Sequence, residues 1–210
     1  MRPDRDRRMT GFSAVLVLIM LMSGCGPTLV PKPDQTGLVD LPSGIITKKV
    51  GGVSVSVQTR QWEYNPSELE QFFLPFLLLV RNETDQKVLL NLKMIYLVDG
   101  GGNQTQPLPP PEVERTMMDR GYVMTPSAHL GVGMGGHHSF FGMGFEFPIN
   151  SPRPLGSDIV SLSLPEGEIL PGSAVRGFVY FNRIPPAGGT LKLHLEINRS
   201  SEDYYFLLRR

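Results

Sequence analysis

The chain has almost no cysteine, no excess of charge of either sign, and no apolar run long enough to cross a bilayer. Cys25 is the single cysteine, and the 20 basic and 20 acidic residues cancel. No basic stripe is present that could neutralise nucleic-acid phosphates. The clearest apolar run, residues 12–22, is far shorter than the roughly 20 residues that a membrane-spanning helix needs. These features argue against a disulfide-stabilised scaffold, a nucleic-acid-binding protein and a spanning helix from this run.

The common catalytic and cofactor motifs are missing as well. The sequence holds no G-x-S-x-G nucleophile turn, no H-E-x-x-H zinc motif, no phosphate-binding glycine loop and no C-x-x-C pair. Acidic residues are scattered one or two to a turn, as on a solvated rim. We therefore expect a protein that is not an enzyme and that binds no cofactor.

The amino-terminal segment is typical of an export signal. Several arginines precede the apolar run 12–22, and this run ends in the stretch MSGC, residues 22–25. That stretch resembles the lipobox of bacterial lipoproteins, which has an apolar residue, two small residues and a lipidated cysteine. The resemblance implies removal of residues 1–24, a diacylglycerol on the sulfur of Cys25 and an acyl chain on its new amino group.

The lipids on Cys25 imply both a location and a partner. Two or more acyl chains anchor a protein stably, whereas one chain does not. In the lipoprotein family an Asp after the cysteine tends to retain the protein in the inner membrane, and this chain has Gly26 there. The resemblance therefore implies the periplasmic face of the outer membrane. Another envelope protein is the further partner that we expect.

Prolines are frequent directly after Cys25, and they favour an extended, semi-rigid chain. Residues 25–48 are therefore expected to form a tether. At about 3.1 Å per residue, the proline-containing part of it, residues 26–43, could hold a domain up to roughly 50 Å from the bilayer. The folded domain is expected over residues 49–210, with a glycine-, phenylalanine- and methionine-rich insertion at about 121–150.

The rest of the chain consists of short apolar stretches separated by polar turns. Residues 53–57 alternate valine with serine, which predicts a half-buried strand. Residues 72–80 are almost continuously apolar, as in a central strand, with Pro75 near a strand start or bulge. Further strands are predicted over residues 88–98 (broken near Asn91), 159–164, 174–182, 190–197 and 204–208, and one helix over 109–120. We expect an all-β fold, an antiparallel sandwich with at most one short helix.

Two stretches resemble the immunoglobulin-like, telokin-like domains of bacterial lipoproteins. LLLVRNETDQKVLLN (77–91), followed by YLVDGGGNQ (96–104), has their order of strand, Asn turn, strand and Asp-Gly turn. LPGSAVRGFVYFN (170–182) has their later Pro-Gly turn before an apolar strand. The resemblance implies an immunoglobulin-like sandwich. Trp62 and Tyr64 could line a binding face, but such aromatics more often cap a sandwich core.

Residues 129–147 have the most unusual composition in the chain. Glycines alternate with large apolar residues in two arms around a polar tip, the pattern of a hairpin with one apolar face. Because glycine loses much entropy on ordering, the stretch could instead be a mobile loop. If its apolar face packs on the sandwich, a partner or a membrane, Phe140, Phe141 and Phe145 are the candidate contact residues.

A third interpretation of residues 129–147 is a copper site, because methionine and histidine suit that metal. The candidate ligands are Met134, His137, His138 and Met143. Adjacent residues of an extended arm point to opposite faces, so the two histidines would converge only in a turn.

Taken together, these features of the sequence predict a non-catalytic, lipid-anchored envelope protein acting as a structural or protein-interaction module. The alternative is a periplasmic copper or small-ligand binding protein that uses residues 129–147.

Overall fold

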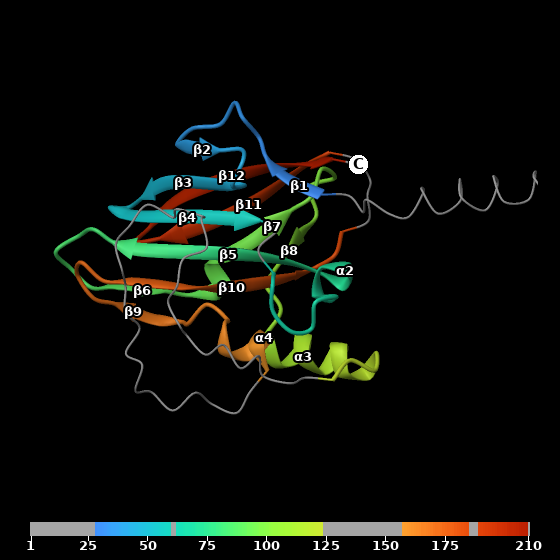
Figure 1. Ribbon diagram of the computed structural model, residues 1–210. Coiled ribbons are helices and arrows are strands. Elements are labelled where there is room, and N and C mark those ends of the chain that lie inside the picture. The colour runs from blue at the N-terminus through green and yellow to red at the C-terminus, as the bar shows by residue number, and fades with distance from the viewer. Residues whose placement is uncertain (1–27, 60–61, 124–156, 185–188, 210) are drawn as a thin grey trace, which may run out of the picture.

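The computed structural model describes residues 28–59, 62–123, 157–184 and 189–209 (Figure 1). They form a sandwich of two five-stranded sheets in which all neighbouring strands are antiparallel. Sheet A has, in spatial order, β1 (Thr28–Pro31), β12 (Ser200–Arg209), β11 (Thr190–Ile197), β7 (Ile95–Val98) and β8 (Gln104–Thr105). Sheet B has β10 (Ala174–Asn182), β5 (Phe73–Asn82), β4 (Val53–Thr59), β3 (Ile45–Val50) and β2 (Leu38–Asp40). The predicted all-β antiparallel sandwich is confirmed.

The main core lies between the two sheets and follows the alternation expected from the sequence. The valines of β4 at positions 53, 55 and 57 are fully buried, while the serines between them face outward. Strand β5 lies between β10 and β4 as a central strand, and Pro75 lies close to its start. Burial of these aliphatic side chains is the principal stabilising term of a sandwich of this kind.

The predicted break near Asn91 is also confirmed. Strand β6 (Val88–Leu90) ends there, a 3-10 helix (Leu92–Met94) follows, and β7 then begins. The Asn91 side chain accepts a hydrogen bond of 2.9 Å from the backbone N–H of Lys93, which closes the turn. Strand β6 pairs with β9 (Gly167–Ile169) in a separate two-stranded sheet.

The expectation of at most one short helix is wrong, because the described residues contain three α-helices besides the 3-10 helix. They are α2 (Leu69–Phe72), α3 (Pro110–Asp119) and α4 (Asp158–Ser161). Of these, α3 is the helix predicted over 109–120. Helix α4 occupies the first half of the strand predicted over 159–164, because the short apolar alternation there did not distinguish a strand from a helix. The Asp158 carboxylate accepts a hydrogen bond from Asn65 N–H at 3.0 Å, a contact between residues far apart in sequence.

The three helices cover part of the outer side of sheet B and enclose a second core there. Helices α3 and α4 lie along the β10 side of that sheet (Figure 1). This second core is rich in aromatic residues: its buried members are Trp62, Leu69, Phe73, Leu77, Val113, Met117, Ile159, Phe178 and Tyr180. Trp62 packs edge-on against Tyr64 and Phe178. It is thus a core residue, as predicted, but of this second core and not of the one between the sheets.

The prediction of a tether over residues 25–48 is wrong for residues 28–48, the part of that range that the structure describes. Residues 28–31 are β1, which pairs with β12, and β2 and β3 follow. Leu29 is buried in the main core, which offsets the entropy cost of ordering a proline-containing segment. Its partner is the last strand of the chain, so proline spacing alone could not reveal the pairing. The folded domain therefore begins at Thr28 at the latest, and not at residue 49.

The edge of β12 beyond β1 is covered by side chains. The Gln35 side chain donates a hydrogen bond to the carbonyl of Tyr205 and accepts one from its N–H, at 2.9 and 3.0 Å. The side-chain amide of Gln35 therefore makes the two hydrogen bonds with Tyr205 that the backbone of a neighbouring strand would otherwise make. Covered edges of this kind oppose pairing with further strands.

Candidate functional site

The outer face of sheet A carries a cluster of polar and aromatic side chains, which we name the Asp203 network. It consists of Tyr96 on β7, Lys192 and His194 on β11, and Asp203 and Tyr205 on β12. In the strand register His194 lies directly between Tyr96 and Asp203. Side chains opposite one another on one face of a sheet are close enough to interact.

The hairpin between β11 and β12 determines this juxtaposition. Its two-residue turn, Asn198 and Arg199, has positive φ angles of 52° and 61°. Two-residue turns of this geometry match the twist of the adjoining strands, and asparagine tolerates the left-handed region well. The turn pairs Ile197 with Ser200, and His194 therefore lies opposite Asp203.

The Asp203 carboxylate is the centre of the network. One oxygen lies 2.6 Å from His194 Nδ1, and the other lies 3.3 Å from both Lys192 Nζ and the Tyr205 hydroxyl. Burial alone would raise the pKa of Asp203. Hydrogen bonds and charge from His194 and Lys192 outweigh that effect and hold the pKa below its usual value of 3.8. Asp203 is therefore ionised at neutral pH.

The aromatic part of the network is ordered by stacking. The rings of Tyr96 and His194 have centroids 4.4 Å apart and planes inclined by 23°, an arrangement that adds to area burial. On the other side, Lys32 Nζ lies 5.9 Å from the Tyr205 ring centroid, within cation–π range. The result is a surface of tyrosine rings and hydrogen-bond donors.

A buried lysine lies next to this network, at the open edge between the sheets. Lys48 points inward from β3 on sheet B, with a side chain only 5% exposed, and lies 3.6 Å from Glu202 on sheet A. Its ammonium also donates to the backbone carbonyl of Asp203 and lies 5.3 Å from the Tyr204 ring centroid. Lys48 therefore links the two sheets by charge where apolar packing ends.

The chemistry open to the network is recognition by charge, hydrogen bonding and aromatic contact. Within the described ranges, no group of three or more His, Cys, Asp and Glu residues is placed to hold a metal ion. His194 contacts the Asp203 carboxylate and the Tyr96 ring. Tyrosine is enriched at protein interfaces, because it offers a large rigid surface with a polar end.

The site residues predicted from the sequence lie outside the described residues. These are the lipidation site Cys25, the metal candidates Met134, His137, His138 and Met143, and the contact candidates Phe140, Phe141 and Phe145. Each of them stays a prediction. Across the part of the chain that the structure describes, no helix is both long and apolar enough to span a membrane.

The candidate site residues predicted from the sequence include no member of this network. A signal was present nonetheless. The Asn198-Arg199 pair, flanked by two alternating stretches, is a candidate two-residue turn. Folding the chain there would have placed His194 opposite Asp203. The predicted last strand, 204–208, began four residues too late for this step.

Comparisons with known proteins place the chain in no family. No protein-family model matches it, and no curated protein does. Among solved structures, the yjhA protein of Bacillus subtilis shares 15% identity, with a TM-score of 0.37 over 70% of this chain and 75% of that one. A similarity this distant supports no conclusion about this chain.

Proposed function

We propose that this protein is a non-catalytic, lipid-anchored module of the bacterial envelope that binds another envelope protein. The MSGC stretch at residues 22–25 carries the anchoring part of the proposal. Cys25 becomes the first residue of the mature chain, and its acyl chains hold the sandwich at the periplasmic face of the outer membrane. The immunoglobulin-like domains of bacterial lipoproteins are the family with which we associate it.

The position of the first strand supports this part of the proposal. Only two residues separate Cys25 from Thr28, where β1 begins. A fully extended chain covers at most about 3.6 Å per residue, so the anchor lies within about 11 Å of the sandwich. The module therefore works close to the bilayer, and not on a stalk of roughly 50 Å.

The Asp203 network is the recognition surface that we assign to the module. The outer side of sheet B is partly covered by its own helices and aromatic core, whereas the outer face of sheet A carries Tyr96, His194, Lys192 and Tyr205 with partial exposure. Partly exposed tyrosines flanked by charged groups are suited to a protein partner.

The anchoring proposal is tested by Cys25→Ser in the full chain. This variant should move from the membrane fraction to the soluble envelope fraction and lose its lipid mass. Gly26→Ala is the matched control, since it retains the thiol and should stay membrane-bound, and Gly26→Asp should shift the protein toward the inner membrane. If Cys25→Ser still sediments with membranes and behaves as wild type does, the anchoring proposal is wrong.

The recognition surface is tested by placing a photo-crosslinking residue on each outer face. An adduct with a defined mass should form from position 96 on sheet A. It should not form from position 56, a partly exposed serine on the outer face of sheet B. The Lys192→Glu variant should reduce the adduct from position 96. Equal adducts from both faces, unchanged in Lys192→Glu, would place the partner elsewhere.

A further inference from the structure

We propose that the sandwich stands end-on at the membrane, with the end that holds the start of β1 next to the lipid surface. The C-terminal turn of α3 supplies a second contact with the lipid headgroups. This inference rests on the proposed lipid anchor at Cys25, and it adds the orientation of the module and the residues that touch the membrane.

The contacts of β1 show which end of the sandwich lies next to Cys25. Thr28, at most about 11 Å from Cys25, pairs with Arg209 at the end of β12. The next residue, Leu29, accepts a hydrogen bond from the Thr59 hydroxyl at the end of β4. The start of β1 and the ends of β12 and β4 therefore lie together at one end of the sandwich, beside the carboxyl terminus in Figure 1.

The C-terminal turn of α3 lies at the same end. The guanidinium of Arg120 lies 4.3 Å from the ring centroid of Phe72, and the carbonyl of Phe72 accepts a hydrogen bond of 3.2 Å from Arg183 N–H. Arg183 directly follows β10, whose last residue pairs with Phe73 at the start of β5. In Figure 1 the end of α3, α2 and the carboxyl terminus all lie on the right of the molecule.

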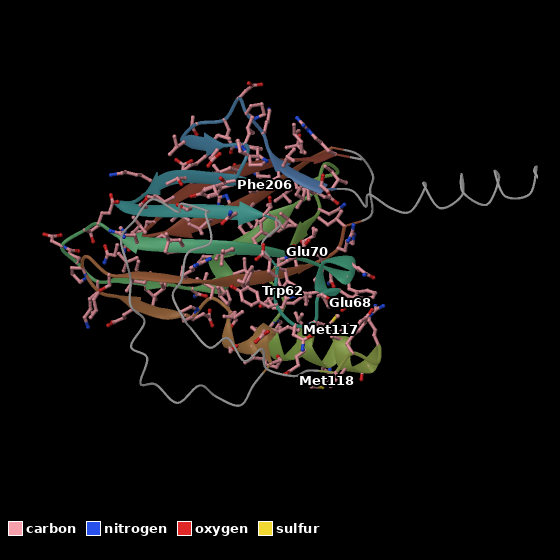
Figure 2. The ribbon with its side chains drawn as sticks, in the orientation of Figure 1. Trp62, Glu68, Glu70, Met117, Met118 and Phe206 are labelled. Atoms are coloured by element: carbon pink, nitrogen blue, oxygen red, sulfur yellow. The ribbon has the colours of Figure 1, made fainter. Side chains whose placement is uncertain are left out.

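Two large apolar side chains are exposed in this turn. Met118 is 50% exposed and Val123 is 75% exposed, while the neighbouring Met117 is fully buried in the second core. Figure 2 shows Met117 on the side of α3 that faces the sandwich and Met118 on its outer side. Exposed apolar side chains beside arginines suit the headgroup layer, where the apolar part enters and the charge stays at the surface.

The charges at this end are mixed, so attraction by net charge is not the basis of the proposal. Arg120 and Arg209 share this end with Glu70 of α2 and with Glu68, the residue before that helix. What selects this end is the short connection to Cys25 together with Met118 and Val123. The membrane is therefore the occupant that accounts for both features.

A second exposed apolar position competes for the membrane. Leu38 on β2 is 72% exposed, and a domain lying on its β2 edge would bury it. Exposed Asp34 and half-buried Asp40 flank this position, and headgroup layers that contain anionic lipid repel carboxylates. The end-on orientation therefore leaves Leu38 in water, and this residue separates the two orientations.

Residues at the two ends of β12 should lie at different distances from the membrane surface if the sandwich stands end-on. Strand β12 runs for ten residues from Ser200 to Arg209, and at about 3.3 Å per residue its ends are roughly 30 Å apart. Ser201 and Arg209 are both exposed. They project from the same face of sheet A because their positions differ by an even number. End-on contact places Arg209 near the headgroups and Ser201 far above them.

The test uses the full lipidated chain in vesicles of phosphatidylethanolamine and phosphatidylglycerol that contain a headgroup-bound quencher. Cys25 is blocked by its lipid, so an introduced cysteine is the one free thiol for a fluorescent label. Labels at Met118→Cys, Val123→Cys and Arg209→Cys should lose most of their emission. Labels at Ser201→Cys and Leu38→Cys should keep theirs. All five positions are exposed, and matching thermal unfolding confirms that each variant folds.

The outcomes separate the orientation from the anchor. Vesicle flotation of the same samples reports whether the lipid holds the protein; failure to float would overturn the proposed anchor and the orientation with it. Flotation with equal emission at all five positions would mean free tumbling on the anchor. Flotation with stronger quenching at Leu38→Cys than at Val123→Cys would mean an edge-on orientation. Either of these results overturns the end-on inference and leaves the anchor intact.

Discussion

The outer faces of the two sheets differ sharply, although both sheets have five strands. The outer face of sheet B is partly covered by three helices and carries a core of nine buried side chains, among them Trp62, Phe178 and Tyr180. The outer face of sheet A carries the Asp203 network and partly exposed polar groups. One face is stabilised mainly by apolar burial, and the other by charge and hydrogen bonding.

The difference indicates where most of the stability resides and separates that region from the proposed recognition surface. Removing a buried aromatic side chain costs several kcal/mol, because transfer energy and cavity formation add. A partly exposed ion pair contributes much less, because water and salt screen it. Substitutions on sheet B should therefore affect folding, and substitutions on sheet A should affect recognition more than folding.

The largest effect is expected from removing the aromatic centre of the second core. Trp62→Ala should lower the free energy of unfolding by about 4 kcal/mol, measured by urea denaturation with circular dichroism. Trp62→Phe, the control, loses mainly the hydrogen bond from Nε1 to the Pro66 carbonyl (2.7 Å) and should cost about half as much. A loss below about 1 kcal/mol in Trp62→Ala would show that this core contributes little.

A slightly smaller effect is expected at Gly177, where the backbone of Leu164 lies against β10 of sheet B. A Cβ atom at Gly177 on β10 would lie 2.4 Å from the Cα and N atoms of Leu164, and backbone atoms cannot move aside cheaply. Gly177→Ala should therefore cost about 3 kcal/mol of unfolding free energy. Arg176→Ala, at the neighbouring exposed position, should cost less than about 0.5 kcal/mol. Equal costs for the two variants would contradict this close approach.

An intermediate effect is expected at the edge where the two faces meet. Lys48→Ala removes a buried ammonium and leaves Glu202 without its cation, which should cost about 2 kcal/mol by thermal or urea unfolding. The matched control is Lys49→Ala on the same strand. Lys49 pairs with Glu83 at 2.7 Å, but its side chain is 75% exposed, so the cost should be about 0.5 kcal/mol or less. Similar losses at both lysines would argue against a cross-sheet role for Lys48.

The smallest effect is expected in the Asp203 network, and it should depend on pH. Because the pKa of Asp203 is held below 3.8 in the folded chain, its stabilisation is present above that value. It is lost as the pH falls through the lower, folded-state pKa. Asp203→Asn should therefore cost about 1 kcal/mol at pH 7. The stabilities of variant and wild type should begin to converge as the pH falls below about 3.8, and they should meet below the folded-state pKa. A difference that does not shrink as the pH falls below 3.8 would contradict the ionic origin.

The elements that were predicted correctly depend on patterns within a few residues. Alternating valines identified β4, a continuous apolar run identified β5, and prolines followed by Glu112 identified α3. In each case the periodicity of the segment matches its own burial, so no distant partner is needed to recognise it. The break at Asn91 is of the same kind, since its side chain bonds two residues away.

The errors arose where a distant partner decides the local structure. Residues 28–31 became β1 because β12 and the main core accept them, although the prolines in and around this stretch favour an extended chain in water as well. Residues 158–161 became α4, where Ile159 is buried in the second core and its carbonyl accepts a hydrogen bond from the Tyr180 hydroxyl at 2.9 Å. Strand and short helix satisfy such a segment almost equally until the neighbours are present.

The order of residues along the chain was enough to indicate an all-β sandwich, because apolar alternation and turns are local patterns. Tertiary structure alone determined that β1 pairs with β12, that Lys48 reaches across to the other sheet, and that His194 meets Asp203. These contacts join residues far apart in sequence or depend on strand register. They form only when burial of apolar surface compensates the entropy of closing the loops between them.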